Sequence, residues 1–151
     1  MSKSSYQTRT KKVVIDGMTF TVMPIGTSQG IDVARRVFKY IGPALSRGLP
    51  MAKGVKSVEE FMELDLTLLT EAFTSLAASL DGGVVDLIKE LCTTGVSLDS
   101  KEFDEKTYEH TFAGAIFQAA ELAAFSAKVK IGPLGFSRSL AASDGDAKSP
   151  G

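Results

Sequence analysis

The chain has 151 residues, with 17 basic and 18 acidic side chains, a net charge of −1 and 44% hydrophobic residues. Its length suits one domain that buries its own core, and its composition is typical of globular proteins rather than disordered or membrane-embedded ones. The near-neutral charge argues against non-specific nucleic-acid binding by the chain as a whole.

The first predicted element is a β-hairpin over residues 11–23. Asp16-Gly17 stands between two apolar stretches, and this dipeptide accepts the positive φ angles of a two-residue type I′ turn. Such a turn pairs Ile15 with Met18 and places both side chains on one apolar face. That face needs a cover from the rest of the domain.

The second predicted element is a helix over residues 28–41. Thr27 or Ser28 can cap its start, and Gly42-Pro43 is expected to end it. Apolar residues recur at helical spacing along one side, which predicts an amphipathic helix. The opposite face is mainly basic and carries Arg35, Arg36 and Lys39.

Two further helices are predicted over residues 58–80 and 83–92. Ser57, followed by Glu60, forms a capping box at the start of the first one. Asp65 interrupts the apolar stripe of this helix, either as the cap of a restarted helix or as a partly wet contact, and we favour the break. Cys92 lies on the apolar face of the other helix, where it is expected to act as a small hydrophobe.

The last predicted helix spans residues 104–131, after a short extended piece over residues 96–98. Its polar side chains gather within about one quarter of a helical wheel, so most of its girth is apolar. Such a helix is either central in its domain or buries a second face in another chain. The second alternative leaves Phe117, Leu122, Phe125 and Val129 as partner-binding candidates.

Together these elements predict an α+β, mostly α fold: an N-terminal antiparallel β-hairpin followed by about four helices. Residues 1–136 are expected to form a single globular domain. Residues 137–151 are small, polar and aperiodic, which predicts a flexible C-terminal tail.

Charge is strongly segregated along the chain. Residues 1–58 carry a net charge of +8, residues 59–121 carry −11, and the remainder carries +2. Most charge runs end in intramolecular pairs and solvated faces, which is the simpler interpretation. The alternative is a basic patch that remains free for a partner.

One motif resembles a catalytic serine turn. Gly26-Thr27-Ser28-Gln29-Gly30 fits the Gly-x-Ser-x-Gly pattern of hydrolases, but these enzymes rest the serine on a large parallel sheet, which is not predicted here. Helix capping explains the motif better, so a Ser28-dependent hydrolase remains a remote alternative. A pairing of Cys92 with His110 is also disfavoured, since an apolar helix face predicts an inert thiol.

No cofactor or metal is expected. One cysteine and one histidine exclude an internal disulfide and a four-ligand zinc site. The first residues lack the apolar core of a signal peptide, and no apolar run approaches the ~20 residues of a membrane span. We therefore expect a non-enzymatic cytoplasmic protein that binds neither membrane nor nucleic acid.

Four segments of the chain, residues 20–30, 37–44, 79–91 and 103–114, carry a family resemblance that extends over about residues 6–136. In this order they resemble the tail assembly chaperones of long-tailed, contractile-type bacteriophages. The sequence departs from the family pattern at Ala115, where similar proteins often have arginine, and at Val129-Lys130-Ile131, where they often have Asn-Phe.

The resemblance implies an assembly factor that coats the tape measure protein, recruits tail tube subunits and is absent from the mature virion. It would act in the host cytoplasm, with self-association as a further possibility. In this role the apolar candidates of the last helix would contact the client, and Arg35, Arg36 and Lys39 would form a docking patch. A structural tail or baseplate adaptor of the virion is the alternative, because it would use the same helix in a permanent interface.

Overall fold

The computed structural model describes residues 10–48, 58–79 and 82–148. The described part is mostly helical, with an antiparallel hairpin at its start, so the predicted fold class is confirmed. The elements in chain order are β1 (Lys11–Ile15), β2 (Met18–Val22), α2 (Thr27–Gly48), α3 (Val58–Glu63), α4 (Leu66–Ala78), α5 (Gly82–Thr93), β3 (Val96–Leu98), β4 (Lys101–Glu102), α6 (Glu105–Thr111) and α7 (Ile116–Lys148).

The hairpin forms in the predicted register. Ile15 lies opposite Met18, and the turn residues Asp16 and Gly17 have φ angles of 53° and 81°. The second edge of β2 pairs antiparallel with β3, where Val22 faces Val96, and β3 pairs in turn with β4. The short extended piece was therefore predicted, but its place in a four-stranded sheet was not.

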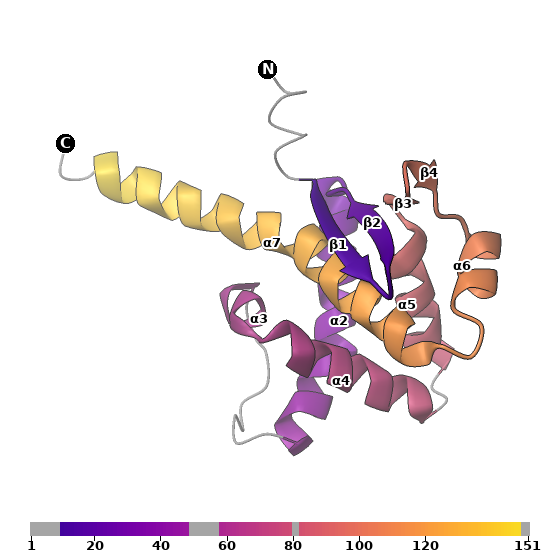
Figure 1. Cartoon of the computed structure of the whole chain (residues 1–151). Coiled ribbons are helices and arrows are strands. Elements are labelled where there is room, and N and C mark those ends of the chain that lie inside the picture. Colours follow the sequence, from indigo (N-terminus) through magenta and orange to yellow (C-terminus); the bar gives the residue numbers. More distant parts are fainter. Residues whose placement is uncertain (1–9, 49–57, 80–81, 149–151) are drawn as a thin grey trace.

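Helix α7 lies at the centre of the domain. Figure 1 shows it crossing between the β-sheet and α4, and α2, α3 and α5 also pack against it. Its alanines at positions 119, 120, 123, 124 and 127 are buried, which lets the neighbouring elements approach closely. Two alternatives were open for this apolar helix, and the first one, a central position in its own domain, explains why most of its sides are apolar.

The helix predicted over residues 104–131 is two helices. Asp104 caps α6 by accepting a hydrogen bond from the Thr107 backbone at 2.8 Å. Gly114 has a φ angle of 69°, a left-handed conformation that a right-handed helix cannot contain, so the chain turns before α7 begins. Gly114 was predicted as a member of the helix, and that prediction was wrong.

Two predicted helix ends also differ from the structure. The helix α2 continues past Gly42-Pro43 to Gly48, and α7 continues through Pro133 to Lys148, into the predicted tail. A proline inside a helix removes one backbone hydrogen bond and its ring crowds the carbonyl four residues earlier, but the helix can continue on both sides of the resulting kink. The C-terminal stretch is rich in alanine and serine, and its composition alone did not predict the helix.

The predicted break at Asp65 is confirmed. Asp65 is the extended residue before α4, and its carbonyl accepts the Leu69 N–H at 3.0 Å, whereas its side chain makes no capping hydrogen bond. The Lys128 ammonium of α7 donates instead to the carbonyls of Met62 at 3.0 Å and Leu64 at 2.5 Å, so it ties the end of α3 to the central helix. Ser57 of the predicted capping box lies outside the described residues.

The conformation of Gly114 generates a stability prediction. Gly114→Ala should lower the free energy of unfolding by about 1–2 kcal/mol, because alanine is disfavoured in the left-handed region. Gly26→Ala is the matched control, since a methyl group at either glycine would meet open space and Gly26 has no positive φ. Urea denaturation of both variants tests this, and equal midpoints would contradict it.

Candidate functional site

An aromatic cluster joins α6 to the sheet. The ring of Phe20 on β2 meets Phe103 edge-on, with 5.1 Å between the centroids, and stacks on Phe112 at 5.9 Å. Phe112 also contacts Tyr108 of α6 at 5.7 Å. Such pairs add to the stabilisation from apolar burial, so this cluster fixes the position of α6 and of the turn that follows it.

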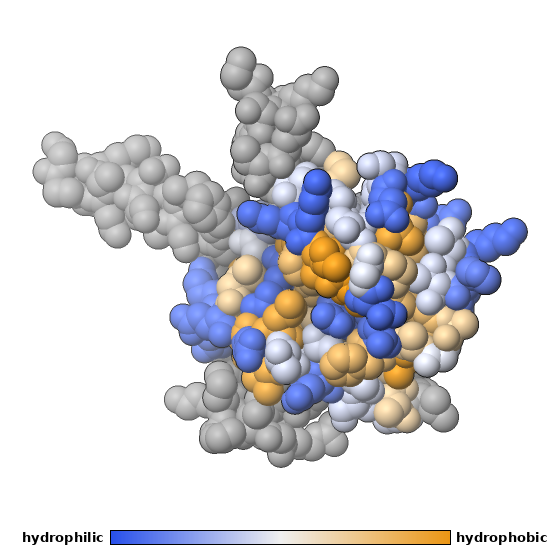
Figure 2. Space-filling model, in the orientation of Figure 1, coloured by the Kyte–Doolittle hydropathy of each residue, from blue (hydrophilic) through white to orange (hydrophobic). Residues whose placement is uncertain are grey.

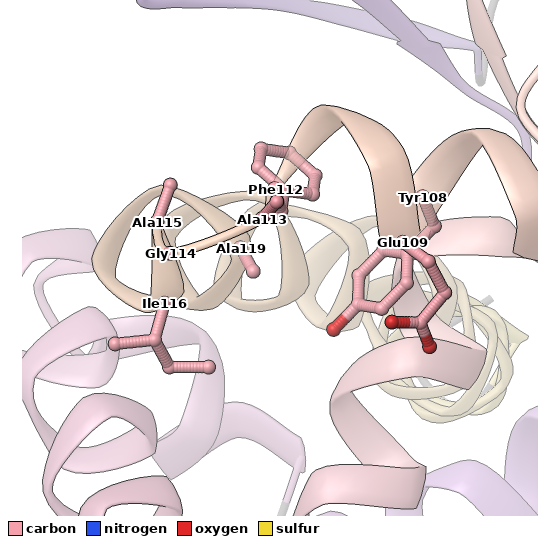
Figure 3. Close-up of a pocket in the computed structure, with 8 residues that line it drawn as sticks. All are labelled: Tyr108, Glu109, Phe112, Ala113, Gly114, Ala115, Ile116 and Ala119. Atoms are coloured by element: carbon pink, nitrogen blue, oxygen red, sulfur yellow. The ribbon is translucent and has the colours of Figure 1, made fainter.

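A hollow of about 380 Å³ lies where α6 turns into α7, and we call it the α6–α7 hollow. Figure 3 shows Tyr108 and Glu109 on one side of it and Ile116 on the other. The Gly114 turn opens the hollow, because it separates the axes of the two helices. The lining residues are Tyr108, Glu109, Phe112, Ala113, Gly114, Ala115, Ile116 and Ala119.

Exposed apolar side chains adjoin this hollow. Ile116 is 45% exposed and Phe117 is 47% exposed, and both belong to the first turn of α7. On the face shown in Figure 2, apolar residues form separate patches between hydrophilic ones. Two large apolar neighbours beside a partly apolar hollow are typical of a protein-binding surface.

The edge of the hollow is acidic. Glu109 lines it, and its carboxylate lies 3.6 Å from the Lys89 ammonium, which contacts Glu105 more closely at 2.7 Å. Hydrogen bonding to Glu105 raises the pKa of Lys89. One lysine therefore faces two carboxylates, so this edge keeps a net negative charge.

The four apolar residues predicted for partner contact have different environments. Phe117 is exposed, whereas Phe125 and Val129 are half-buried and pack against the core. Leu122 is fully buried in the free chain, so it offers no exposed surface for client contact. The apolar sides of α7 that made Leu122 a candidate are covered by the domain itself, and among the side chains described up to Leu134 the large exposed apolar ones of α7 lie in its first turn.

The three basic residues predicted for docking also differ in their environments. The Arg36 guanidinium donates to Glu90 of α5 at 2.8 Å and to Asp32 at 3.3 Å. The Glu90 hydrogen bond is the main cause of the raised pKa of Arg36. Arg36 therefore takes part in an intramolecular pair, as the simpler interpretation of the charge pattern expects, whereas Arg35 and Lys39 are exposed.

The candidate catalytic residues do not form a site in the described part of the chain. Ser28 lies in the exposed first turn of α2, and His110 is exposed on α6. Because α2 begins at Thr27 and the Gly26 carbonyl accepts the Gly30 N–H, the residue that precedes the helix is Gly26 rather than Thr27 or Ser28. The Cys92 thiol is buried and donates to the Ala119 carbonyl at 3.3 Å, and burial raises its pKa. Within the described residues no acidic, cysteine or histidine cluster could hold a metal, and no helix is long and apolar enough to cross a membrane.

Sequence reasoning missed two features of this region. Ile116 was not among the predicted partner-binding residues, although it is 45% exposed and follows the Gly114 break by two residues. Lys130 was also missed as a buried residue, although it is only 2% exposed. Gly114 was the sequence signal that could have revealed the exposure of Ile116, because an isolated glycine in a helical pattern can mark a break.

A family model described as phage tail assembly chaperone protein, TAC, matches residues 16–134. This span includes the α6–α7 hollow, the exposed residues of α2 and the core of the domain. No curated protein and no solved structure matches the chain.

The different burial of Phe117 and Leu122 generates a second prediction. Phe117→Ser should change the free energy of unfolding by no more than about 0.5 kcal/mol, because this side chain is half exposed. Leu122→Ala should lower it by about 2–5 kcal/mol, because it creates a cavity in the core. Urea denaturation measures both, and a similar loss in the two variants would show that Phe117 is a core residue.

Proposed function

Because the chain belongs to the phage tail assembly chaperone family, we propose that it binds and solubilises the tape measure protein and helps to recruit tail tube subunits. A chaperone role in tail assembly follows from the family alone. The observation that supports a client-binding surface is the α6–α7 hollow, with Ile116 and Phe117 exposed beside it.

The proposed client contact is an amphipathic helix of the tape measure protein laid against this hollow. A helix binds in such a groove through apolar residues spaced three or four positions apart. Ile116 and Phe112 belong to the lining of the hollow, and Phe117 is exposed next to Ile116 in the chain, so they offer apolar contacts to such a helix. Burying these exposed side chains is favourable because it removes apolar surface from water.

The acidic edge suggests which client segments bind. Glu109 and Glu105 would repel an acidic segment and favour one that carries lysine or arginine beside its apolar stripe. Charges at the rim of an interface act mainly on the rate and selectivity of association. The hollow therefore supplies affinity through its apolar lining, and the edge supplies selectivity.

A second surface is available for tail tube subunits. Arg35 and Lys39 are four residues apart on α2, so they share one exposed helical face. Since Arg36 is paired with Glu90, we propose Arg35 and Lys39 as the docking residues for an acidic surface of the tube subunit. Two surfaces of opposite charge allow one adaptor to hold two different partners.

An assembly factor of this kind acts in the host cytoplasm and does not remain in the particle. Its function needs no cofactor and no chemical step, only reversible contacts. Self-association would add copies of the same surfaces along a long client. Mass spectrometry of purified virions separates this function from that of a structural tail or baseplate adaptor, which would be present in stoichiometric amounts.

The client surface is tested by co-expression with the tape measure protein of the same phage. The wild-type chain should keep the client soluble and co-purify with it. With the double variant Ile116→Ser, Phe117→Ser, the amount of co-purified client should fall at least tenfold. Val85→Ser is the matched control, since Val85 is 39% exposed but lies on α5. Client binding that is unchanged in the double variant would place the contact elsewhere.

The docking surface requires a separate measurement. Arg35→Glu combined with Lys39→Glu should abolish co-purification of tail tube subunits and leave tape measure binding intact. Lys12→Glu is the control, because Lys12 is an exposed cation on β1. Loss of both partners in the double variant, or of neither, would contradict two separate surfaces.

A further inference from the structure

The four-stranded sheet ends on both sides in a strand with a free edge. β1 forms one edge and β4 forms the other, and Figure 1 shows them on opposite sides of the sheet. Within residues 10–48, 58–79 and 82–148 no further strand pairs with either of them. A free strand edge presents unpaired N–H and C=O groups, and a strand from another chain can extend the sheet there.

The backbone of Lys12 points to the free edge of β1. Ile15 and Met18 flank a two-residue turn and form a hydrogen-bonded pair, and such pairs alternate with non-hydrogen-bonded ones along an antiparallel ladder. Lys12 lies three residues before Ile15, at a non-hydrogen-bonded position. The N–H of Asp99 donates to the Thr19 carbonyl at 3.2 Å, which fits this alternation because Thr19 then directs its backbone to β3. The Lys12 N–H and C=O therefore face away from β2.

Glu102 has the corresponding position on β4. The N–H of Phe103 donates to the Val96 carbonyl at 3.0 Å, so the backbone of Phe103 is directed to β3. Glu102 is the residue before it, so its N–H and C=O are directed to the opposite side, which is the free edge of β4. The ring of Phe103 is held in the aromatic cluster, 5.1 Å from that of Phe20. This contact fixes the short strand in place.

Lys12 and Glu102 stand at the two ends of one row across the sheet. Lys12 is opposite Thr21. Thr21 is opposite Ser97, which is in turn opposite Glu102. Side chains that lie opposite one another share one face of the sheet, so a lysine ends this row on one side and a glutamate ends it on the other. Both side chains are exposed, and neither makes an ion pair with another described residue.

We propose that β4 of one copy of this chain pairs with β1 of the next copy, with Glu102 opposite Lys12. Neighbouring strands of the sheet are antiparallel throughout, and a β1 strand added antiparallel to β4 continues that alternation. The backbones of the two residues then exchange both of their hydrogen bonds. The same register places Lys101 on the other face of the sheet, opposite Val13 rather than opposite a lysine.

Charge favours this pairing over the symmetric ones. β1 contains Lys11 and Lys12 and no acidic residue, so two β1 edges would bring lysines of both copies together. Two β4 edges paired at their edge-facing residue would place Glu102 opposite a second Glu102. Like charges directly opposite one another destabilise a pair of strands, whereas opposite charges stabilise it. A lysine on an exposed edge discourages non-specific strand pairing, and a glutamate on the incoming strand is the partner that it accepts.

Pairing of two different edges is head-to-tail, so it produces rings or open chains of copies rather than symmetric dimers. This contact extends the proposed function, in which self-association repeats the client surface along a long partner, but it forms between copies of this chain alone. It uses residues of neither the α6–α7 hollow nor the exposed face of α2. Lys12→Glu is therefore expected to weaken self-association without changing tube docking on a single copy.

Sedimentation velocity of the purified chain over a concentration series tests the contact. The weight-average mass of the wild type should rise with concentration beyond that of two chains. Lys12→Glu and Glu102→Lys should each lower the association constant roughly tenfold, because each places like charges opposite one another. An equimolar mixture of the two variants should restore the association of the wild type, because every lysine edge then meets a glutamate edge.

The matched controls are Lys106→Glu on α6 and Glu71→Lys on α4, which make the same charge changes at exposed positions away from both edges. They should associate like the wild type. Amide hydrogen exchange locates the contact in the wild-type chain: at high concentration the Lys12 and Glu102 amides should exchange more slowly. The Val13 amide, which already faces β2, should keep its rate.

A chain that stays monomeric at millimolar concentration would overturn the pairing. Association that stops at two chains and is unaffected by Glu102→Lys would instead indicate a symmetric β1 contact, and a mixture that does not restore association would exclude the opposite charges as its basis. Wild-type hydrogen exchange remains a test if a variant does not fold. Because no client is present, these outcomes are independent of whether the tape measure protein binds.

Discussion

The fold depends on one requirement: an apolar helix without a broad polar face must be covered on nearly every side. Helix α7 meets this requirement through α2, α3, α4, α5 and β1, all of which pack against it. The buried alanines of α7 let these elements pack close to it. Where α2 contacts α7, Gly30 has no side chain, and a methyl group there would lie 3.5 Å from the Lys130 carbonyl. These surrounding elements therefore form a shell around α7, which is their common packing partner.

The proposed client surface lies where this cover ends. At Gly114 the chain turns between α6 and α7, and the first turn of α7 leaves Ile116 and Phe117 about half exposed. The aromatic cluster of Phe20, Phe103 and Phe112 holds α6 in place beside that turn. An exposed apolar surface is thus supported by a rigid core, which keeps it in one geometry before a partner arrives.

Local chemistry made the hairpin, the Asp65 break and the short α5 predictable, because each depends on residues adjacent in sequence. The pairing of β3 with β2 joins residues more than seventy positions apart, and no local pattern encodes it. Periodicity also could not decide whether Leu122 faces a core or a partner, since both environments require an apolar side chain. The burial of Lys130 was equally beyond local reasoning: a lysine is almost never fully buried, and only the packing of α5 reveals the exception.

The position of α7 in the chain has a consequence for biosynthesis. Every element that packs against the helix is encoded before it, so the ribosome releases the shell while its inner surface is still uncovered. The β1–β2 hairpin can form early from its own turn, and α2, α4 and α5 also contact one another, but their contacts with α7 form only when translation has passed residue 131. We therefore expect folding to be completed late, so that the nascent chain exposes apolar surface for most of its synthesis.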